Sequence, residues 1–396
     1  MLTALVYVQH LLGIGHLMRA SALARGLEAA GIRVLLVSGG MPVPVLDTGA
    51  SRLEQLPPVR AADGNFNDLV NDSGEPVDDA WKMQRCRRLL QIFDRVRPDI
   101  LLTELYPFGR RQMRFELVPL LTHARARREQ TGLPVIASSV RDILFPPSKA
   151  GRTEEIIEVV RRYYDLVLVH GDQDVIPFDR SFARAADIAD LTRSTGYVVG
   201  SIPARQGSGS PGYDEVLVSA GGGAVSDDLL QAAIGARALC RLRDRPWRVL
   251  IGHNYPEDAF LSYRAAAPRG VQVERARGDF TQLLANCALS ISQGGYNTVA
   301  EILATGTRAV CLPYAGGGES EQTLRCRLMA EQGALQIVEK DAVCAEQVAL
   351  AVERALEAHP PGGHIANTDG AARSTELLLA LVRSHRPEEI HRESRT

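Results

Sequence analysis

The sequence predicts an α/β protein of two domains, each built on a parallel β-sheet. Short apolar runs alternate with longer segments of helical periodicity along most of the chain, the pattern of a layered α/β architecture. The length of 396 residues is too great for one ordinary core and suits two domains of about 200 residues each. Residues 201–213 are rich in Gly, Ser and Pro, which predicts a linker between the domains.

Five short apolar runs in the first half are predicted to be buried parallel strands. These runs are residues 4–8, 33–38, 100–103, 135–138 and 166–170. Residues 16–30 carry apolar side chains at helical spacing and stop at Gly31, so they are predicted to be the helix of an opening βαβ unit.

A second set of strands is predicted after the linker. It comprises residues 215–220, 248–251, 271–275, 289–292, 309–313 and 335–338. We therefore expect an N-terminal domain over residues 1–200, a linker over 201–213 and a C-terminal domain over 214–370. An amphipathic helix over 371–385 and a charged tail over 386–396, too poor in apolar residues to order itself, complete the chain.

Composition excludes several classes of protein. Lys and Arg total 45 against 47 for Asp and Glu, which gives no electrostatic reason to expect a nucleic-acid partner. The six cysteines form no C-x-x-C pair and the start of the chain does not read as a signal peptide, so we expect reduced thiols and a cytoplasmic protein. No apolar run approaches the roughly 20 residues of a membrane span, although peripheral membrane contact stays open.

The first motif lies between the first strand and the first helix. Gly13 and Gly15 allow the backbone to turn tightly and approach a ligand, and the following helix N-terminus favours an anion. His16 could accept a proton from an attacking hydroxyl when neutral, or pair with a phosphate when charged. A purely structural turn is the alternative, and the third glycine of a dinucleotide fingerprint is missing.

The equivalent turn of the second half contains three successive glycines at 221–223. Gly222 and Gly223 are predicted to help form a phosphate-binding nest of backbone N–H groups. A flexible turn without a ligand is the alternative.

The third motif is the most informative, and it runs from Ser292 to Glu301. Gly294 and Gly295 free the turn after a strand, and Asn297 and Thr298 then fall in the first helical turn, where they can meet phosphates. Glu301 lies one turn further along, where its carboxylate can accept hydrogen bonds from both hydroxyls of a ribose. After the next strand, Glu321 and Gln322 offer groups suited to sugar hydroxyls.

Further polar residues follow strands of the first half, at the sheet edge where ligands of open α/β sheets bind. Glu104 could be an accessory base or could orient an acceptor. Arg19, Tyr106, Arg110 and Arg141 are candidate acceptor contacts, with a solvated surface loop as the alternative. Asp172 and Asp174 match a D-x-D metal pattern but stand away from the phosphate loops, so we expect no metal and no cofactor.

Residues 292–322 resemble the donor site of GT-B glycosyltransferases. They are similar both to family 28, represented by the peptidoglycan N-acetylglucosaminyltransferase, and to the plant family 1 UDP-glycosyltransferases. The plant signature is His-Cys-Gly-Trp-Asn-Ser, then Glu, then Asp-Gln. This chain shows Ser-Gln-Gly-Gly-Tyr-Asn-Thr, then Glu301, then Glu321-Gln322, with Gln293 where the plant enzymes have His. Gly13 to His16 likewise match the glycine loop and His of family 28.

The resemblance implies the GT-B fold, in which two Rossmann-like domains face a cleft and the C-terminal helix packs back on the N-terminal domain. It implies a nucleotide-sugar donor held by Glu301 at the ribose, by Asn297 and Thr298 at the diphosphate, and by Glu321 and Gln322 at the sugar. The implied enzyme transfers a sugar from a UDP-sugar to a hydroxyl acceptor without metal and with inversion. A nucleotide-sugar hydrolase, a UDP-sugar 2-epimerase and a non-catalytic nucleotide-sugar-binding protein remain alternatives.

Overall fold

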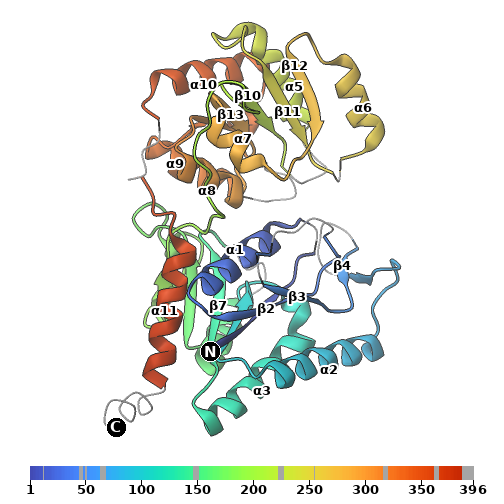
Figure 1. Cartoon of the computed structure of the whole chain (residues 1–396), viewed down its shortest axis with the longest axis vertical. Helices are drawn as coiled ribbons and strands as arrows, with labels where there is room; N and C mark the ends of the chain where they lie inside the picture. Colours follow the sequence, from blue (N-terminus) through green and yellow to red (C-terminus); the bar gives the residue numbers. More distant parts are fainter. Residues whose placement is uncertain are drawn as a thin grey trace. The chain divides into compact units, whose positions relative to one another are not determined.

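The computed structural model describes residues 1–11, 13–43, 48–49, 51–62, 68–145, 151–221, 227–253, 255–314, 320–360 and 365–385. The chain divides into two compact units (Figure 1). Unit 1 comprises Met1–Gln173, Pro177–Val198 and Asp369–Thr396, and unit 2 comprises Asp174–Ile176 and Val199–Thr368. The chain therefore leaves unit 1 near the start of the predicted linker and returns to it just before the C-terminal helix.

Unit 1 contains a parallel sheet of seven strands in the order β3-β2-β1-β6-β7-β8-β9. The strands are β1 (Thr3–Val8), β2 (Arg33–Ser38), β3 (Arg52–Gln55), β6 (Ile100–Glu104), β7 (Val135–Arg141), β8 (Leu166–His170) and β9 (Thr192–Ser194). All five strands predicted for this half are present. A separate antiparallel pair is formed by β4 (Val59–Ala61) and β5 (Leu69–Asn71).

Helices cover both faces of this sheet because successive side chains of a strand point to opposite faces. Ala4 and Val6 share one core cluster with α1 (Gly15–Ala29) and α11 (Gly370–His385). Leu5 and Tyr7, which alternate with them along β1, share another cluster with α2 (Asp79–Val96) and α3 (Arg114–Thr131). The remaining helices of unit 1 are α2 (Asp79–Val96), α3 (Arg114–Thr131) and α4 (Arg152–Tyr163), with 3₁₀ turns at Arg111–Met113, Phe178–Arg180 and Ala185–Ile188.

The C-terminal helix α11 packs on the N-terminal domain, as the sequence predicted. Its Leu378 and Val382 are buried in the same cluster as Leu17 and Leu23 of α1. The two helices lie side by side (Figure 1), and a Cβ on Gly26 of α1 would lie 3.1 Å from the Cβ of Ala371. Small residues at this crossing therefore permit the close approach.

Unit 2 contains a parallel sheet of six strands in the order β12-β11-β10-β13-β14-β15. The strands are β10 (Val216–Ser219), β11 (Trp247–Ile251), β12 (Val271–Arg275), β13 (Leu289–Ser292), β14 (Ala309–Cys311) and β15 (Gln336–Ile337). The helices are α5 (Asp227–Ala236), α6 (Glu257–Ala266), α7 (Phe280–Asn286), α8 (Tyr296–Thr305), α9 (Glu321–Glu331) and α10 (Ala345–Glu357), with 3₁₀ turns at Arg237–Leu239 and Lys340–Ala342. All six strands predicted for this half are present.

Both sheets share one topology, the strand order 3-2-1-4-5-6 of a Rossmann fold, which unit 1 extends by one edge strand. In each sheet the order reverses beside the first strand, between β1 and β6 in unit 1 and between β10 and β13 in unit 2. Ligands of such sheets bind at the carboxyl ends of the strands at this switch point. The glycine motifs of the sequence follow β1, β10 and β13, so the topology places them at the two switch points.

A buried ion pair links α2 and α3 to β1 beneath the N-terminal sheet. Arg85 and Glu116 are both fully buried, with 2.7 Å between Arg85 Nε and Glu116 Oε2. Arg85 also donates to Gln9 Oε1 at 2.6 Å and to the Gly39 carbonyl at 2.9 Å. Tyr7 donates its hydroxyl proton to Glu116. The pair is therefore tied to the ends of both β1 and β2.

Replacing Arg85 by Met is expected to destabilise unit 1, because Glu116 would be left buried without its counter-charge. Breaking one side of a buried pair typically costs about 3–5 kcal/mol. Arg88→Met is the matched control, since Arg88 lies on the same helix but is 45% exposed where it pairs with Glu54, and an exposed pair contributes less than about 1 kcal/mol. Chemical denaturation of both variants measures the difference, and equal stabilities would contradict the buried network.

Candidate functional site

The switch point of unit 1 brings together a histidine and a carboxylate. His16 lies in the first turn of α1, Glu104 is the last residue of β6, and His16 Nδ1 lies 2.9 Å from Glu104 Oε1. The side chain of Glu104 is 1% exposed and that of His16 is 14% exposed. Both residues were predicted as parts of a catalytic site, and the structure places them in direct contact.

The Glu104 carboxylate is ionised although it is buried. Burial alone would raise its pKa, but the charge of Arg19 and hydrogen bonds from His16 and Ser139 outweigh burial and hold the pKa at about 2. Arg19 forms an ion pair with Oε1, and the Ser139 hydroxyl donates to Oε2. The carboxylate is therefore fixed by groups from two elements, α1 and β7.

His16 is neutral near pH 7. Burial and then the charge of Arg110 lower its pKa to about 3, against the opposing effect of Glu104. Arg19 Nη2 lies 3.2 Å from Nδ1 but donates to Glu104 Oε1. Because an ionised carboxylate only accepts hydrogen bonds, we assign the hydrogen of the neutral ring to Nδ1, facing Glu104. The lone pair of Nε2 then points away from Glu104, and no described residue donates a hydrogen bond to it. His16 can thus accept a proton at Nε2.

The hydrogen-bond chain continues behind Glu104. Ser139 Oγ lies 2.8 Å from His170 Nε2, and His170 Nδ1 lies 2.9 Å from Thr195 Oγ1. Since Ser139 gives its only proton to Glu104, His170 must donate from Nε2 and accept at Nδ1. The sequence analysis did not identify Ser139 or His170. Their only signal was their place near the ends of the adjacent strands β7 and β8.

Two arginines predicted to face the acceptor lie at this same edge. Arg110 donates to the Gln9 carbonyl at 2.7 Å, and Arg141 donates to the Ile143 carbonyl at 3.0 Å. Burial, followed by the charge of Arg141, lowers the pKa of Arg110 to about 10. Because the two positive charges repel each other, an anion bound beside them would be stabilised.

Two other predicted acceptor contacts are buried. Arg19 is buried and forms an ion pair with Glu104, so its charge stabilises the ionised carboxylate. Tyr106 is 2% exposed and packs in the core cluster that contains Met113 and Leu117, and burial raises the pKa of Tyr106 to about 12. The sequence could not show this, because a residue just after a strand can turn into the core as easily as out of it.

The loop after β13 in unit 2 is held closely against α9. A Cβ on Gly294 would overlap the sulfur of Cys326, whereas a Cβ on Gly295 would meet nothing within 4 Å. Gly295 then begins α8 without a side-chain cap, so Asn297 and Thr298 stand in the first turn, where the helix dipole favours an anion. This is the geometry predicted for diphosphate binding.

The two predicted sugar contacts on α9 hold this loop together. Glu321 is 4% exposed and pairs with Arg325 at 2.6 Å, and Arg325 donates to the Gly294 carbonyl at 3.1 Å. Gln322 accepts a hydrogen bond from the Tyr314 backbone N–H at 3.1 Å. The structure thus places Glu321 in a buried ion pair and not at an exposed donor contact. The sequence analysis missed Arg325, whose only signal was its i,i+4 spacing from Glu321.

Glu301 lies on α8 one turn beyond Asn297 and accepts a hydrogen bond from Thr281 of α7 at 2.9 Å. Burial raises its pKa to about 7, in spite of the hydrogen bond from Thr281. A carboxyl with this pKa exchanges protons near neutral pH.

The glycine loop after β10 meets the loop after β13 at the switch point of unit 2. Gly221 has a φ of +70°, and a Cβ built on it would lie 3.1 Å from Gln293 Oε1. Gly222 and Gly223 lie outside the described residues. In unit 1, a Cβ on Gly13 would meet nothing within 4 Å, and Gly15 is the first residue of α1.

The described residues contain no group of three or more His, Cys, Asp or Glu side chains arranged to hold a metal ion. Within the same residues, no helix combines the length and apolar character needed to cross a membrane. The cytoplasmic location stays a prediction.

Comparison with known proteins agrees with this geometry. Residues 217–370 match the model of the glycosyltransferase family 28 C-terminal domain. Two curated relatives, from Syntrophotalea carbinolica and an Exiguobacterium species, are both named UDP-N-acetylglucosamine--N-acetylmuramyl-(pentapeptide) pyrophosphoryl-undecaprenol N-acetylglucosamine transferase.

The first relative is 29% identical over 219 residues, which cover 52% of this chain and 55% of the relative. The second is 24% identical over 169 residues, which cover 43% of this chain and 47% of the relative. The chain therefore spans about half the length of the curated relatives it matches.

Solved structures resemble the whole chain. The calicheamicin glycosyltransferase CalG4 aligns over 97% of this chain and 95% of its own, with a TM-score of 0.57 and 14% identity. MurG of Acinetobacter baumannii aligns over 96% and 99%, with a TM-score of 0.53 and 14% identity. The spinosyn rhamnosyltransferase SpnG, solved with thymidine diphosphate, aligns over 97% and 96%, with a TM-score of 0.54 and 17% identity. The GT-B fold predicted from the sequence is confirmed.

Gly294→Ala is expected to destabilise the family 28 domain, because the new methyl group must displace the Cys326 sulfur or the loop. Overpacking of this kind costs about 1–3 kcal/mol. Gly295→Ala is the matched control, with open space at its Cβ and an expected change within about 0.5 kcal/mol. Thermal melting measures both, and the double variant Gly294→Ala/Cys326→Ala should recover part of the loss. Equal melting temperatures for the two single variants would show that the loop is not constrained.

Proposed function

We propose that this protein is a glycosyltransferase that moves a sugar from a nucleotide-sugar donor to a hydroxyl acceptor. The observation that carries the proposal is the His16–Glu104 pair at the switch point of unit 1. A neutral imidazole, fixed in one tautomer by an ionised carboxylate, is the arrangement required to take a proton from a hydroxyl group.

The donor is a UDP-sugar in this proposal. Support comes from the family 28 domain and from the names of both curated relatives, which specify UDP-N-acetylglucosamine. SpnG was solved with thymidine diphosphate, but SpnG shares only its fold with this chain and does not bear on the choice of nucleotide. Glu301 binds the ribose, and Asn297 and Thr298 bind the diphosphate at the start of α8. Gln322 lies beside the Gly294 loop and is the proposed contact to the donor sugar.

The reaction proceeds by direct displacement at the anomeric carbon. His16 removes the acceptor proton as the acceptor oxygen attacks, and the bond to the diphosphate breaks on the opposite face, so the configuration inverts. The developing charge on the diphosphate is stabilised by the N-terminus of α8 and the glycine-loop amides, without a metal ion. Arg19 and Ser139 are positioning residues, because they act on the reaction by holding Glu104.

Acceptor binding belongs to the carboxyl edge of the sheet of unit 1, beside His16. Arg110 and Arg141 supply positive charge there, which favours an acceptor that carries a phosphate or another anionic group. An anion at this place would also offset the charge of Arg110, which depresses the pKa of His16. Acceptor binding would therefore strengthen the base that activates the acceptor.

His16→Ala is expected to lower kcat by about 10²–10⁴-fold while leaving UDP affinity nearly unchanged, because the base is lost and the nucleotide is held by unit 2. Steady-state kinetics with UDP-N-acetylglucosamine and calorimetry with UDP measure the two quantities. His123→Ala is the matched control, since His123 is a half-exposed histidine of unit 1 that pairs with Asp94 on the outer helices.

Wild-type turnover in His16→Ala would exclude the base role, and a parallel loss of UDP affinity would assign His16 to phosphate binding. Incubation with UDP-N-acetylglucosamine alone separates transfer from hydrolysis, because a hydrolase turns over fully with water as acceptor. The same base serves both reactions, so the two experiments are independent.

Affinity for a UDP-sugar is expected to fall as the pH is lowered through 7. Protonation of Glu301, whose pKa is about 7, competes with ribose binding, so affinity should weaken up to about tenfold per pH unit below that value. A UDP-sugar is the suitable probe, because its doubly esterified diphosphate has no proton to gain there. Calorimetry between pH 5.5 and 8 measures the effect. Glu301→Gln should bind more weakly and without this pH dependence, and a wild-type affinity that is flat with pH would contradict the ribose assignment.

A further inference from the structure

A cavity lies in unit 2, away from the predicted donor site. Its volume is about 390 Å³, within the range of small-molecule sites. Asp214, Arg245, Ala288 and Arg308 line it, and each stands one or two residues before a strand of the sheet, β10, β11, β13 or β14. Because the strands are parallel, their amino ends share one edge, whereas the glycine loops follow the carboxyl ends. The cavity is thus at the opposite edge from the donor loops.

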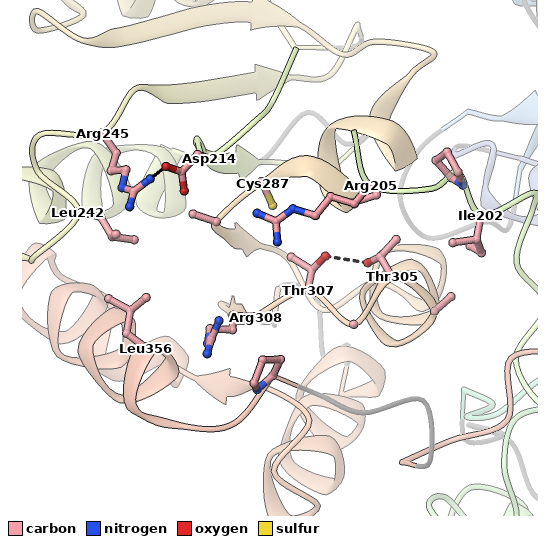
Figure 2. Close-up of a pocket in the computed structure, with 16 residues that line it drawn as sticks. Ile202, Arg205, Asp214, Leu242, Arg245, Cys287, Thr305, Thr307, Arg308 and Leu356 are labelled. Carbon is pink, nitrogen blue, oxygen red and sulfur yellow. Dashed lines mark hydrogen bonds and ion pairs between the residues drawn. The ribbon is translucent and has the colours of Figure 1, made fainter. Parts of the chain in front are cut away.

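Three arginines surround this cavity (Figure 2). Arg245 forms an ion pair with Asp214. Neither Arg205 nor Arg308 has a carboxylate partner among the described residues, and the Nε of Arg308 is buried without any hydrogen-bond partner. Three guanidinium charges and one carboxylate leave the lining of the cavity positive.

The unpaired positive charge of this cavity contrasts with the paired arginine of the adjacent strand. Arg248, on the adjacent strand β11, forms ion pairs with Glu215 at 2.7 Å and with Glu274 at 2.8 Å. Helix C-termini at the cavity offer a structural explanation for arginines, since carbonyl groups there attract cations. No hydrogen bond from the side chain of Arg205 or Arg308 to such a carbonyl is found in the described part of unit 2. The guanidinium of Arg205 instead lies over the ring of Tyr213, 5.8 Å from its centroid.

We propose that this cavity binds a small phosphorylated metabolite, with Arg205 and Arg308 as its principal contacts. Guanidinium groups present paired N–H donors that match the oxygens of a phosphate group. The volume accommodates a molecule of the size of a sugar phosphate or a mononucleotide. Arg245 also lines the cavity, where its charge is balanced by the ion pair with Asp214 (Figure 2).

The ligand would touch both stretches that join unit 2 to unit 1 along the chain. Ile202, Pro203 and Arg205 follow the crossing at Val198, and Pro360 precedes the crossing at Asp369. The proposed site shares no residue with the donor loops. The proposal therefore does not depend on the proposed sugar transfer.

Calorimetric titration of the full-length chain with inorganic pyrophosphate tests the proposal. The variant Arg205→Gln/Arg308→Gln should bind pyrophosphate at this site at least tenfold more weakly than the wild type. Arg243→Gln is the matched control, an exposed arginine of the same unit that does not line the cavity and should bind as the wild type does. Asn297→Ala, at the carboxyl edge, should retain the binding that the double variant loses.

Arg308→Lys keeps the charge without the paired donors and should show an intermediate loss, which keeps the test decisive if the double variant does not fold. Pyrophosphate binding that is absent in the wild type, or equal in the wild type and the arginine variants, would overturn the proposal. Binding to phosphatidylglycerol vesicles without binding to pyrophosphate would also overturn it, since the ligand would then be a lipid headgroup.

Discussion

The candidate site depends on one buried charge, the carboxylate of Glu104. An ionised carboxyl group inside a protein is stable only when opposite charge and hydrogen-bond donors surround it. Arg19 and His16 from α1 and Ser139 from β7 supply them, so α1 and β7 are both held at the end of β6. The tautomer of His16, and with it the position of the free lone pair, follows from the charge state of Glu104.

The repeated topology explains why the chemistry is divided between the units. Each sheet has one switch point where the strand order reverses, and the residues at the two switch points differ in kind. In unit 1 the switch point carries charged and titratable side chains, whereas in unit 2 it carries glycines and a helix N-terminus. The first is suited to proton transfer, and the second to binding a phosphorylated ligand by its backbone.

The sequence predicted the elements that depend on local pattern and missed those that depend on distant contacts. Every predicted strand is present, because a buried parallel strand is a short apolar run whatever its neighbours are. The edge strand β3 was missed because its residues Arg52–Gln55 are polar and partly exposed, as edge strands often are. Arg85 and Arg325 were also missed, since nothing in the residues around a charged side chain shows that its partner is buried beside it.

The same limit applies to the site. His16 and Glu104 were each predicted from their place after a strand, yet they are 88 positions apart, and only the strand order shows that they touch. Glu321 matched the donor signature by sequence, but its pairing with Arg325 depends on the packing of α9. The three arginines of the cavity in unit 2 come from three separate segments and form no motif.

The position of α11 has a consequence for how the chain is made. Unit 1 needs residues from both ends of the sequence, because α11 covers apolar side chains of α1 and of the first sheet strands. Unit 2 is almost continuous, and all of it leaves the ribosome before α11 does. The second unit can therefore complete its core during synthesis, while the first keeps one apolar face uncovered until α11 has been made. Such an exposed face is a substrate for chaperones, and a chain truncated before α11 would keep it permanently.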